Sequence, residues 1–116
     1  MTQHDDVLYL GHMLDMARKA RDIAQPVSKD QYDANDTLQL ALARLVQNIG
    51  EAARRVSAER KAAHPAISWH RIVGMRHRLV HDYGNVDTGI VWQTVSEDLP
   101  ILIEMLEKIV PPNPPE

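Results

Sequence analysis

The sequence contains no cysteine and no phenylalanine, and tryptophan and tyrosine supply only 4% of its 116 residues. The absence of cysteine excludes disulfides and thiolate metal ligands, and it favours a cytoplasmic location. No apolar run approaches the roughly 20 residues that a membrane-spanning helix needs. The acidic, polar start from Met1 to Asp6 also differs from a secretory signal. We therefore expect a cytoplasmic protein that has no membrane partner.

The charge of the chain is distributed unevenly. The formal net charge of −3 excludes a surface that is basic throughout. Seven of the 13 Lys and Arg residues nevertheless fall between Arg54 and Arg78, against the single acid Glu59, and the rest of the chain carries six bases and 15 acids. Such a basic stretch on an acidic body can attract a polyanion. Alternatively, Arg54 to Lys61 simply forms a solvated helix end near its negative dipole pole.

Helical periodicity dominates the first half of the chain. Apolar residues at steps of three and four predict an amphipathic helix from Asp5 to Ala24. Ser28 to Gln31 has the form of a capping box, which predicts a short helical turn. Residues 33–36 offer caps for a second long helix. Its expected buried stripe comprises Leu38, Ala41, Leu42, Leu45, Val46, Ile49, Ala52, Ala53 and Val56. Gly50 inside this helix indicates close packing against another helix.

The second half predicts two more helices. Ser68 can cap a third helix from Trp69 to about Asp82, and Asp87 can cap a fourth that reaches Val110. Pro100 must kink the fourth helix or split it at Leu99. No segment alternates as a strand would. We therefore predict an all-α antiparallel bundle of four to five helices. One helical domain spans residues 1–110, and a proline-rich tail spans residues 111–116.

The stretch from Gly74 to Tyr83 concentrates side chains with useful chemistry. The fixed charge of Arg76 and the titratable imidazole of His81 suit work on a phosphodiester, which needs charge neutralisation and proton transfer. On a regular helix these two side chains diverge by about 140°. They can share one phosphate only if the helix unwinds near Gly84 or a second copy of the chain contributes. A homodimer would meet this requirement.

Simpler roles are open for the same residues. Arg76 can form a salt bridge with Glu51, and His81 can be an interfacial histidine. His77 and His81, four residues apart, resemble a metal pair, but they lack a clearly placed third ligand, so we expect neither a metal nor a cofactor. Arg78 is either an outer RNA contact or part of a surface ion pair.

The two tryptophans, Trp69 and Trp92, occupy helical apolar positions. Both indole rings could stack on bases. Because few other aromatic residues are available, packing in the core or in a dimer interface is the better interpretation.

The segment Arg76-x4-His81-x-Tyr83, together with ordered flanking elements, resembles the HepT-like branch of the HEPN domain family. The flanking elements are Ile49 to Ala53, Ile67 to Met75, Val86-Asp87, Val91-Trp92 and Asp98 to Pro100. The resemblance runs from roughly Asp5 to Leu106. It implies a helical-bundle homodimer that acts as a metal-independent endoribonuclease. It also implies the toxin half of a HepT/MntA-type toxin–antitoxin pair.

Position by position, the resemblance implies that Arg76 stabilises the scissile phosphate and His81 is the general acid/base. His77 and Arg78 would contact the substrate. A cognate nucleotidyltransferase antitoxin would block the site by attaching AMP to Tyr83. His77 departs from the asparagine that the family often has there, which leaves the pH optimum open. Two rival hypotheses are a non-catalytic binding module that partners a nucleotidyltransferase, and a structural dimer held by interfacial ion pairs.

Overall fold

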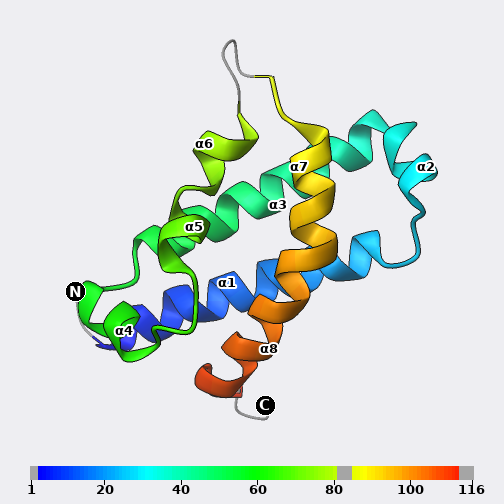
Figure 1. Cartoon of the computed structure of the whole chain (residues 1–116). Coiled ribbons are helices and arrows are strands. Elements are labelled where there is room, and N and C mark those ends of the chain that lie inside the picture. Colours follow the sequence, from blue (N-terminus) through cyan, green and yellow to red (C-terminus); the bar gives the residue numbers. More distant parts are fainter. Residues whose placement is uncertain (1–2, 81–84, 113–116) are drawn as a thin grey trace.

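Helices make up most of the part of the chain that the structure describes (Figure 1). The computed structural model describes residues 3–80 and 85–112. The helices are α1 (Gln3–Ala24), α2 (Lys29–Asp33), α3 (Asp36–Arg54), α4 (Ala58–Ala63), α5 (Trp69–Val73), α6 (Met75–Leu79), α7 (Thr88–Gln93), the π-helical segment η2 (Thr94–Asp98) and α8 (Leu99–Ile109). The all-α class is confirmed.

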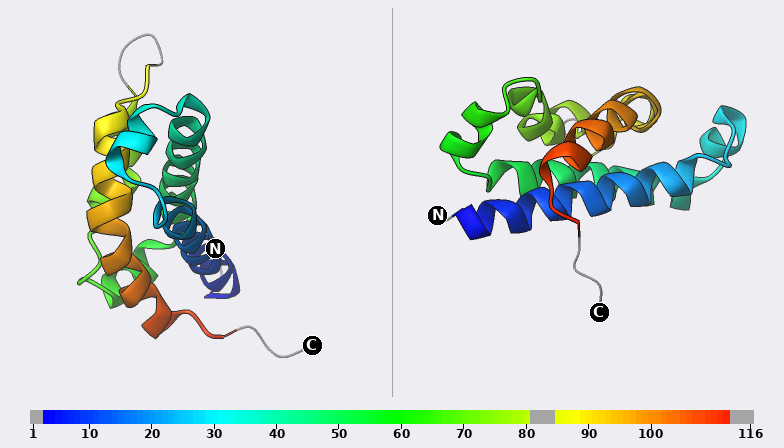
Figure 2. Two further views of the ribbon diagram at one scale, coloured as in Figure 1. Left: turned by 90° about the vertical axis from the view of Figure 1, so that its right-hand side faces the viewer. Right: turned by 90° about the horizontal axis from the view of Figure 1, so that it is seen from below.

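The helices form two layers (Figure 2). The long helices α1 and α3 run antiparallel and pack side by side. On one side of this pair lie α5 and α6, and beside them the continuous rod of α7, η2 and α8. The buried apolar face of α1 and the buried face of α3 meet the second layer, so the core lies between the layers. The short helices α5 and α6 therefore lie on the pair formed by the long helices α1 and α3.

Local signals account for the helix starts in the first half. Ser28 and Gln31 form the expected reciprocal capping box at α2, and Asn35 caps α3 by accepting from the Leu38 amide at 3.0 Å. The buried stripe of α3 is largely as expected, except that Ala41 is exposed and Ala43 is buried in its place.

α4 starts from a cap of its own and does not continue α3. The hydroxyl of Ser57 accepts from the Arg60 amide at 3.1 Å. Asp6 on α1, only 3% exposed, accepts from the Ser57 amide at 2.8 Å and from the Ser57 hydroxyl at 2.6 Å. Burial acts to raise the pKa of Asp6, but the two hydrogen bonds from Ser57 and the nearby charge of Arg60 act against it, so the pKa is lowered. A carboxylate thus ties the α4 start to α1.

Tyr32 joins α2 to the start of α7. Its ring is fully buried and lies 4.7 Å from the Trp92 ring, and its hydroxyl donates to the Thr88 carbonyl at 2.7 Å. The pKa of Tyr32 is raised to about 12. Burial of the phenol is the largest cause, and the nearby carboxylates of Asp33 and Asp87 add to it. The phenol therefore stays a hydrogen-bond donor at any physiological pH.

Pro100 lies at the point where the π-helical segment η2 passes into α8, the position at which the sequence predicted a kink or a break. It lies in the first turn of α8, where a helix does not need the missing amide hydrogen. The preceding π-helical turn, η2, absorbs the change in hydrogen-bond register. Among the described residues, no helix is both long and apolar enough to cross a membrane.

Candidate functional site

The helix expected from Trp69 to about Asp82 is two short helices, α5 and α6, followed by an extended Val80, so the expectation of one helix was wrong. The amide of Gly74 donates to the His70 carbonyl at 3.0 Å, and its own carbonyl accepts from the His77 amide at 3.1 Å. These bonds close a turn between the helices. Ser68 precedes α5 as predicted, although its hydroxyl makes no capping hydrogen bond within the described residues.

Arg76 is exposed on α6. Within the ranges 3–80 and 85–112 it makes no ion pair. Glu51, the partner that the sequence offered, instead lies 3.7 Å from Arg54 on its own helix. The sequence left open a simpler role for Arg76, a salt bridge to Glu51 of α3. The described residues do not show this salt bridge. A guanidinium in this setting can take an anionic ligand.

The neighbours of Arg76 differ in their exposure. His77 is exposed, whereas Arg78 is half-buried and its Nη1 lies 3.9 Å from the sulfur of Met75. This weak contact holds the Arg78 side chain along α6. The sequence left two roles open for Arg78, an outer RNA contact and a surface ion pair. No ion pair of Arg78 appears among the described residues.

α6 ends at Leu79 because the chain becomes extended there. Val80 has φ −106° and ψ 116°, and it pairs with Val86 as an isolated antiparallel bridge. The amide of Asp87 donates to the Leu79 carbonyl at 2.7 Å. Asp87 then caps α7 as predicted, with its carboxylate accepting from the Ile90 amide at 3.0 Å. The two sides of the 81–84 segment are thus held together.

His81 and Tyr83, the predicted general acid/base and the predicted modification site, lie outside the described residues and stay predictions. The divergence of Arg76 and His81 that a regular helix predicts does not apply, because α6 ends at Leu79. For the same reason, the four-residue helical spacing that would make His77 and His81 a metal pair does not apply. Among the described residues, no cluster of three His, Asp or Glu side chains is placed to hold a metal ion.

Both tryptophans pack against the core, as predicted. Trp69 donates its indole N–H to the His64 carbonyl at 3.0 Å, and the Trp92 ring lies on Tyr32. Their rings therefore help to fix α5 and α7 on the bundle.

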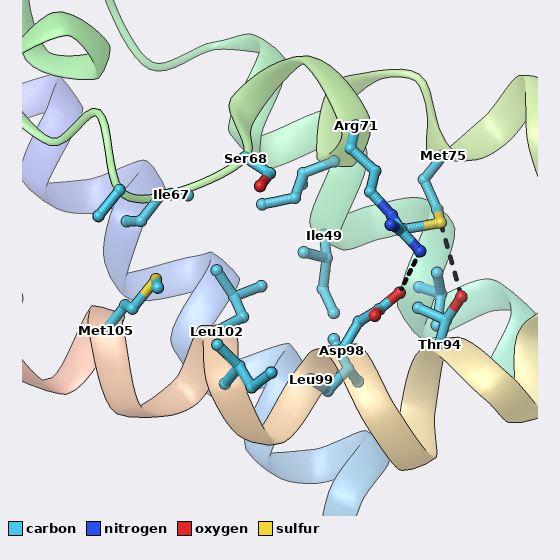
Figure 3. A pocket seen from close by; sticks show the side chains of 14 residues that line it. Ile49, Ile67, Ser68, Arg71, Met75, Thr94, Asp98, Leu99, Leu102 and Met105 are labelled. Carbon is cyan, nitrogen blue, oxygen red and sulfur yellow. Dashed lines mark hydrogen bonds and ion pairs between the residues drawn. The ribbon is translucent and has the colours of Figure 1, made fainter.

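One feature near α6 escaped the sequence analysis: an apolar pocket of about 150 Å³ (Figure 3). It is lined by Val46, Ile49, Ala66, Ile67, Ser68, Arg71, Ile72, Met75, Thr94, Asp98, Leu99, Ile101, Leu102 and Met105. Arg71 of α5 and Asp98 of η2 form an ion pair beside it, with 3.1 Å between Nη2 and Oδ2. No local signal marks this pair, because the two residues are 27 positions apart.

The structure is an all-α domain in which α6 presents the exposed side chains of Arg76 and His77. Residues 13–109 match the family described as ribonuclease HepT-like. The chain is 30% identical over 101 residues to "Probable ribonuclease HepT" of Thermococcus cleftensis, which covers 87% of this chain and 92% of that protein. The chain therefore belongs to the ribonuclease HepT-like family.

Two further relatives match over most of their length. A protein of Caldanaerobacter subterraneus, named as a candidate RNase, is 28% identical over 88% of this chain and 91% of its own. A protein of Methanocaldococcus jannaschii with the same kind of name is 26% identical over 92% of this chain and 98% of its own. No solved structure matches the chain.

Proposed function

We propose that the chain is an endoribonuclease that cuts RNA, without a metal ion, at a site built around Arg76 and His81. Membership of the HepT-like family and the names of the relatives support ribonuclease-type chemistry. The observation that carries the assignment to this segment is the exposed Arg76 side chain, which makes no ion pair among the described residues. It precedes His81 by five positions and sits on a short, braced helix.

The proposed chemistry needs one fixed cation and two proton transfers. Arg76 holds the non-bridging oxygens of the scissile phosphate with its planar guanidinium. A neutral histidine takes the proton of the ribose 2′-hydroxyl as its oxygen attacks phosphorus. A protonated histidine gives its proton to the departing 5′-oxygen. The products are a 2′,3′-cyclic phosphate and a 5′-hydroxyl, and no other reactant is consumed.

We propose that two copies of the chain share the site. One His81 cannot be protonated and neutral at once, so a histidine from each copy supplies the acid and the base. His77 and Arg78 add contacts to the substrate backbone around Arg76. Two copies of α6 also double the local positive charge that attracts RNA.

We further propose that a nucleotidyltransferase antitoxin silences the enzyme by attaching AMP to the Tyr83 hydroxyl. The phosphate of AMP brings a negative charge next to Arg76, where it competes with the scissile phosphate for the guanidinium. The adenosine adds bulk. Purified protein carrying AMP on Tyr83 would accordingly bind RNA poorly even with Arg76 and His81 unchanged.

The test is cleavage of total cellular RNA by purified protein in EDTA, with wild type compared with His81→Ala and Arg76→Ala. We expect wild type to leave cyclic-phosphate ends, and each variant to lose about 10²-fold or more in rate. Arg76 is exposed and is not part of the buried core, and circular dichroism of both variants checks that they stay folded.

A matched control is His70→Ala, which removes an exposed imidazole from α5. We expect this variant to cleave at the wild-type rate. If wild type and all variants fail to cut, the chain is the non-catalytic binding module. If His81→Ala cuts like wild type, the general acid/base lies elsewhere.

A further inference from the structure

We propose that the apolar pocket between α3, α5 and α8 binds one guanine base of the RNA strand, with Asp98 and Arg71 contacting the polar edge of the base. The inference rests on the proposed function, since it names a specificity site for the RNA that the enzyme cuts. It can fail while the proposed nuclease stands, because the chemistry at Arg76 and His81 needs no particular base.

The pocket has the size and the walls that a flat ring needs. Its volume is about 150 Å³, and most of its lining is aliphatic carbon. Ile49 of α3, Ile72 of α5 and Leu102 of α8 contribute to the walls from three different helices. An apolar cavity of about this size accepts a benzene ring, so the six-membered ring of a base fits inside while the sugar stays at the mouth. Enzymes that take a base out of a strand commonly hold it between apolar side chains in this way.

The charged groups lie together at one end of the pocket (Figure 3). Arg71 extends from α5 and Asp98 from η2, and they meet near Met75, whereas Ile67 and Met105 lie toward the other end. Among the described residues, the hydrogen bond of this pair uses only Nη2 of Arg71 and Oδ2 of Asp98, 3.1 Å apart. The two side chains are 51% and 34% accessible. The second carboxylate oxygen and the rest of the guanidinium can therefore bond a ligand.

Guanine is the base whose edge matches this pair. Its N1–H and N2–H groups are adjacent donors that suit the two oxygens of Asp98, and its O6 and N7 atoms are acceptors for Arg71. Adenine would turn an unprotonated N1 toward the same carboxylate. Uracil has one N–H between two carbonyls, and cytosine has the acceptor N3 beside its amine. Only guanine offers the carboxylate two neighbouring donors.

The pocket is continuous with the proposed active site. Met75 lines it and directly precedes Arg76 on α6, so their Cα atoms are about 3.8 Å apart. The sulfur of Met75 lies 3.8 Å from the Thr94 hydroxyl and 3.9 Å from Nη1 of Arg78, which holds this side chain between the pocket and α6. A strand whose phosphate binds Arg76 can therefore place a nearby base in the pocket, close to the bond that is cut.

The first experiment measures binding of short labelled oligouridylates that carry one central guanosine, inosine or adenosine. Fluorescence anisotropy is recorded with His81→Ala protein, so that the strands stay intact. We expect the guanosine strand to bind about 10-fold more tightly than the adenosine strand, as for one matched base contact. Inosine keeps N1–H but lacks the N2 amine, so its strand should fall between them. Free guanosine 5′-monophosphate should bind more weakly than the guanosine strand, because it lacks the further phosphates that the cations hold.

The second experiment repeats these titrations with Asp98→Asn added. An amide turns one of the two acceptors into a donor, so the ratio of guanosine-strand to adenosine-strand affinity should fall toward unity. The matched control is Glu97→Gln, which removes the same charge from the adjacent position of η2, where Glu97 is exposed and does not line the pocket. Its ratio should stay at the parent value. A general gain in RNA affinity from the lost charge cancels in the ratio.

Methyl NMR of the same His81→Ala protein locates the bound base. Adding the guanosine strand should shift the methyl signals of Ile49 and Leu102, which line the pocket, and should leave that of Leu10 in place. Leu10 is a buried residue of α1 that does not line the pocket.

Equal affinities for the guanosine and adenosine strands overturn the inference. A guanosine preference that survives Asp98→Asn, or free guanosine 5′-monophosphate that binds as tightly as the strand, also overturns it. If wild type then still leaves cyclic-phosphate ends on cellular RNA, the proposed nuclease stands without this base selection. A protein that neither binds the strands nor cuts RNA overturns both.

Discussion

Gly50 is a position at which the two layers come very close together. A Cβ atom there would lie 2.9 Å from the carbonyl oxygen of Ile72 on α5, and 3.8 Å from the Cβ of Met75. The first distance is too short for a real contact, and its partner is a backbone atom that cannot rotate away. The close packing that the sequence indicated at Gly50 is thus confirmed. It holds α5, and through it α6, against α3.

We predict that Gly50→Ala destabilises the fold although alanine is the better helix former. The overpacking cost of about 1–3 kcal/mol outweighs the gain of about 1 kcal/mol in helix propensity. Gly11→Ala is the matched control, because a Cβ at Gly11 in α1 meets nothing within 4 Å. It should be neutral or stabilising. Urea unfolding of both variants measures the difference, and a Gly50→Ala as stable as Gly11→Ala would contradict the packing argument.

At the scale of elements, α4 depends on one buried carboxylate from α1. Asp6 satisfies both the amide and the hydroxyl of Ser57, and Ser57 in turn caps α4. We predict that Asp6→Asn lowers the free energy of unfolding at pH 7 by about 1–3 kcal/mol, since a charged acceptor is lost from a buried site. Asp22→Asn, which removes an exposed acid that pairs with Arg21 on the same helix, should change it little.

The effect of Asp6 should depend on pH in a defined direction. Its folded-state pKa lies below the ordinary value of 3.8, so the unfolded chain binds the proton more tightly. The stabilisation is therefore complete above about pH 4 and is lost as the pH falls through the lowered pKa. Unfolding curves of wild type and Asp6→Asn should converge in this acidic range. A difference that stays constant down to pH 2 would show that the charge is not responsible.

The elements also show what the sequence could predict and what it could not. The caps at Ser28, Asn35 and Asp87 were found because each side chain bonds an amide only three residues ahead. The end of α6 was missed because it depends on Val80 meeting Val86, a pairing that helical periodicity does not encode.

The candidate site, too, could be predicted from the sequence only in part. The clustering of cations on α6 was visible in the sequence, and the exposure of Arg76 agrees with it. The pocket was not visible in the sequence, because its lining residues come from separate helices. Arg71 and Asp98, for example, meet only when the second layer packs on α3. His81 and Tyr83 stay predictions from the resemblance.

At the scale of the whole molecule, the basic stretch becomes one side of the bundle. α4, α5 and α6 follow one another along α3, and residues 54–78 carry seven Lys and Arg against one acid (Figure 1). Some of this charge is compensated, since Arg54 pairs with Glu51 and Arg71 with Asp98. The acidic remainder of the chain would repel an RNA from the other surfaces. RNA should therefore approach along α4 to α6, and its affinity should depend on salt through the cations of this side alone.

We predict that Lys61→Ala on α4 and Arg76→Ala on α6 each reduce the salt dependence of RNA binding. Each phosphate contact adds about 0.7 to the slope of log affinity against log salt for a single strand. Both changes are made in the His81→Ala background, so that the RNA stays intact during fluorescence anisotropy titrations from low to moderate NaCl. Lys19→Ala, an exposed cation on α1, is the control and should leave the slope unchanged. If Lys19→Ala lowers the slope as much as Lys61→Ala, RNA is held by the net charge of the protein rather than by this side. A loss with Arg76→Ala alone would confine the contact to α6 and leave α4 free for another partner.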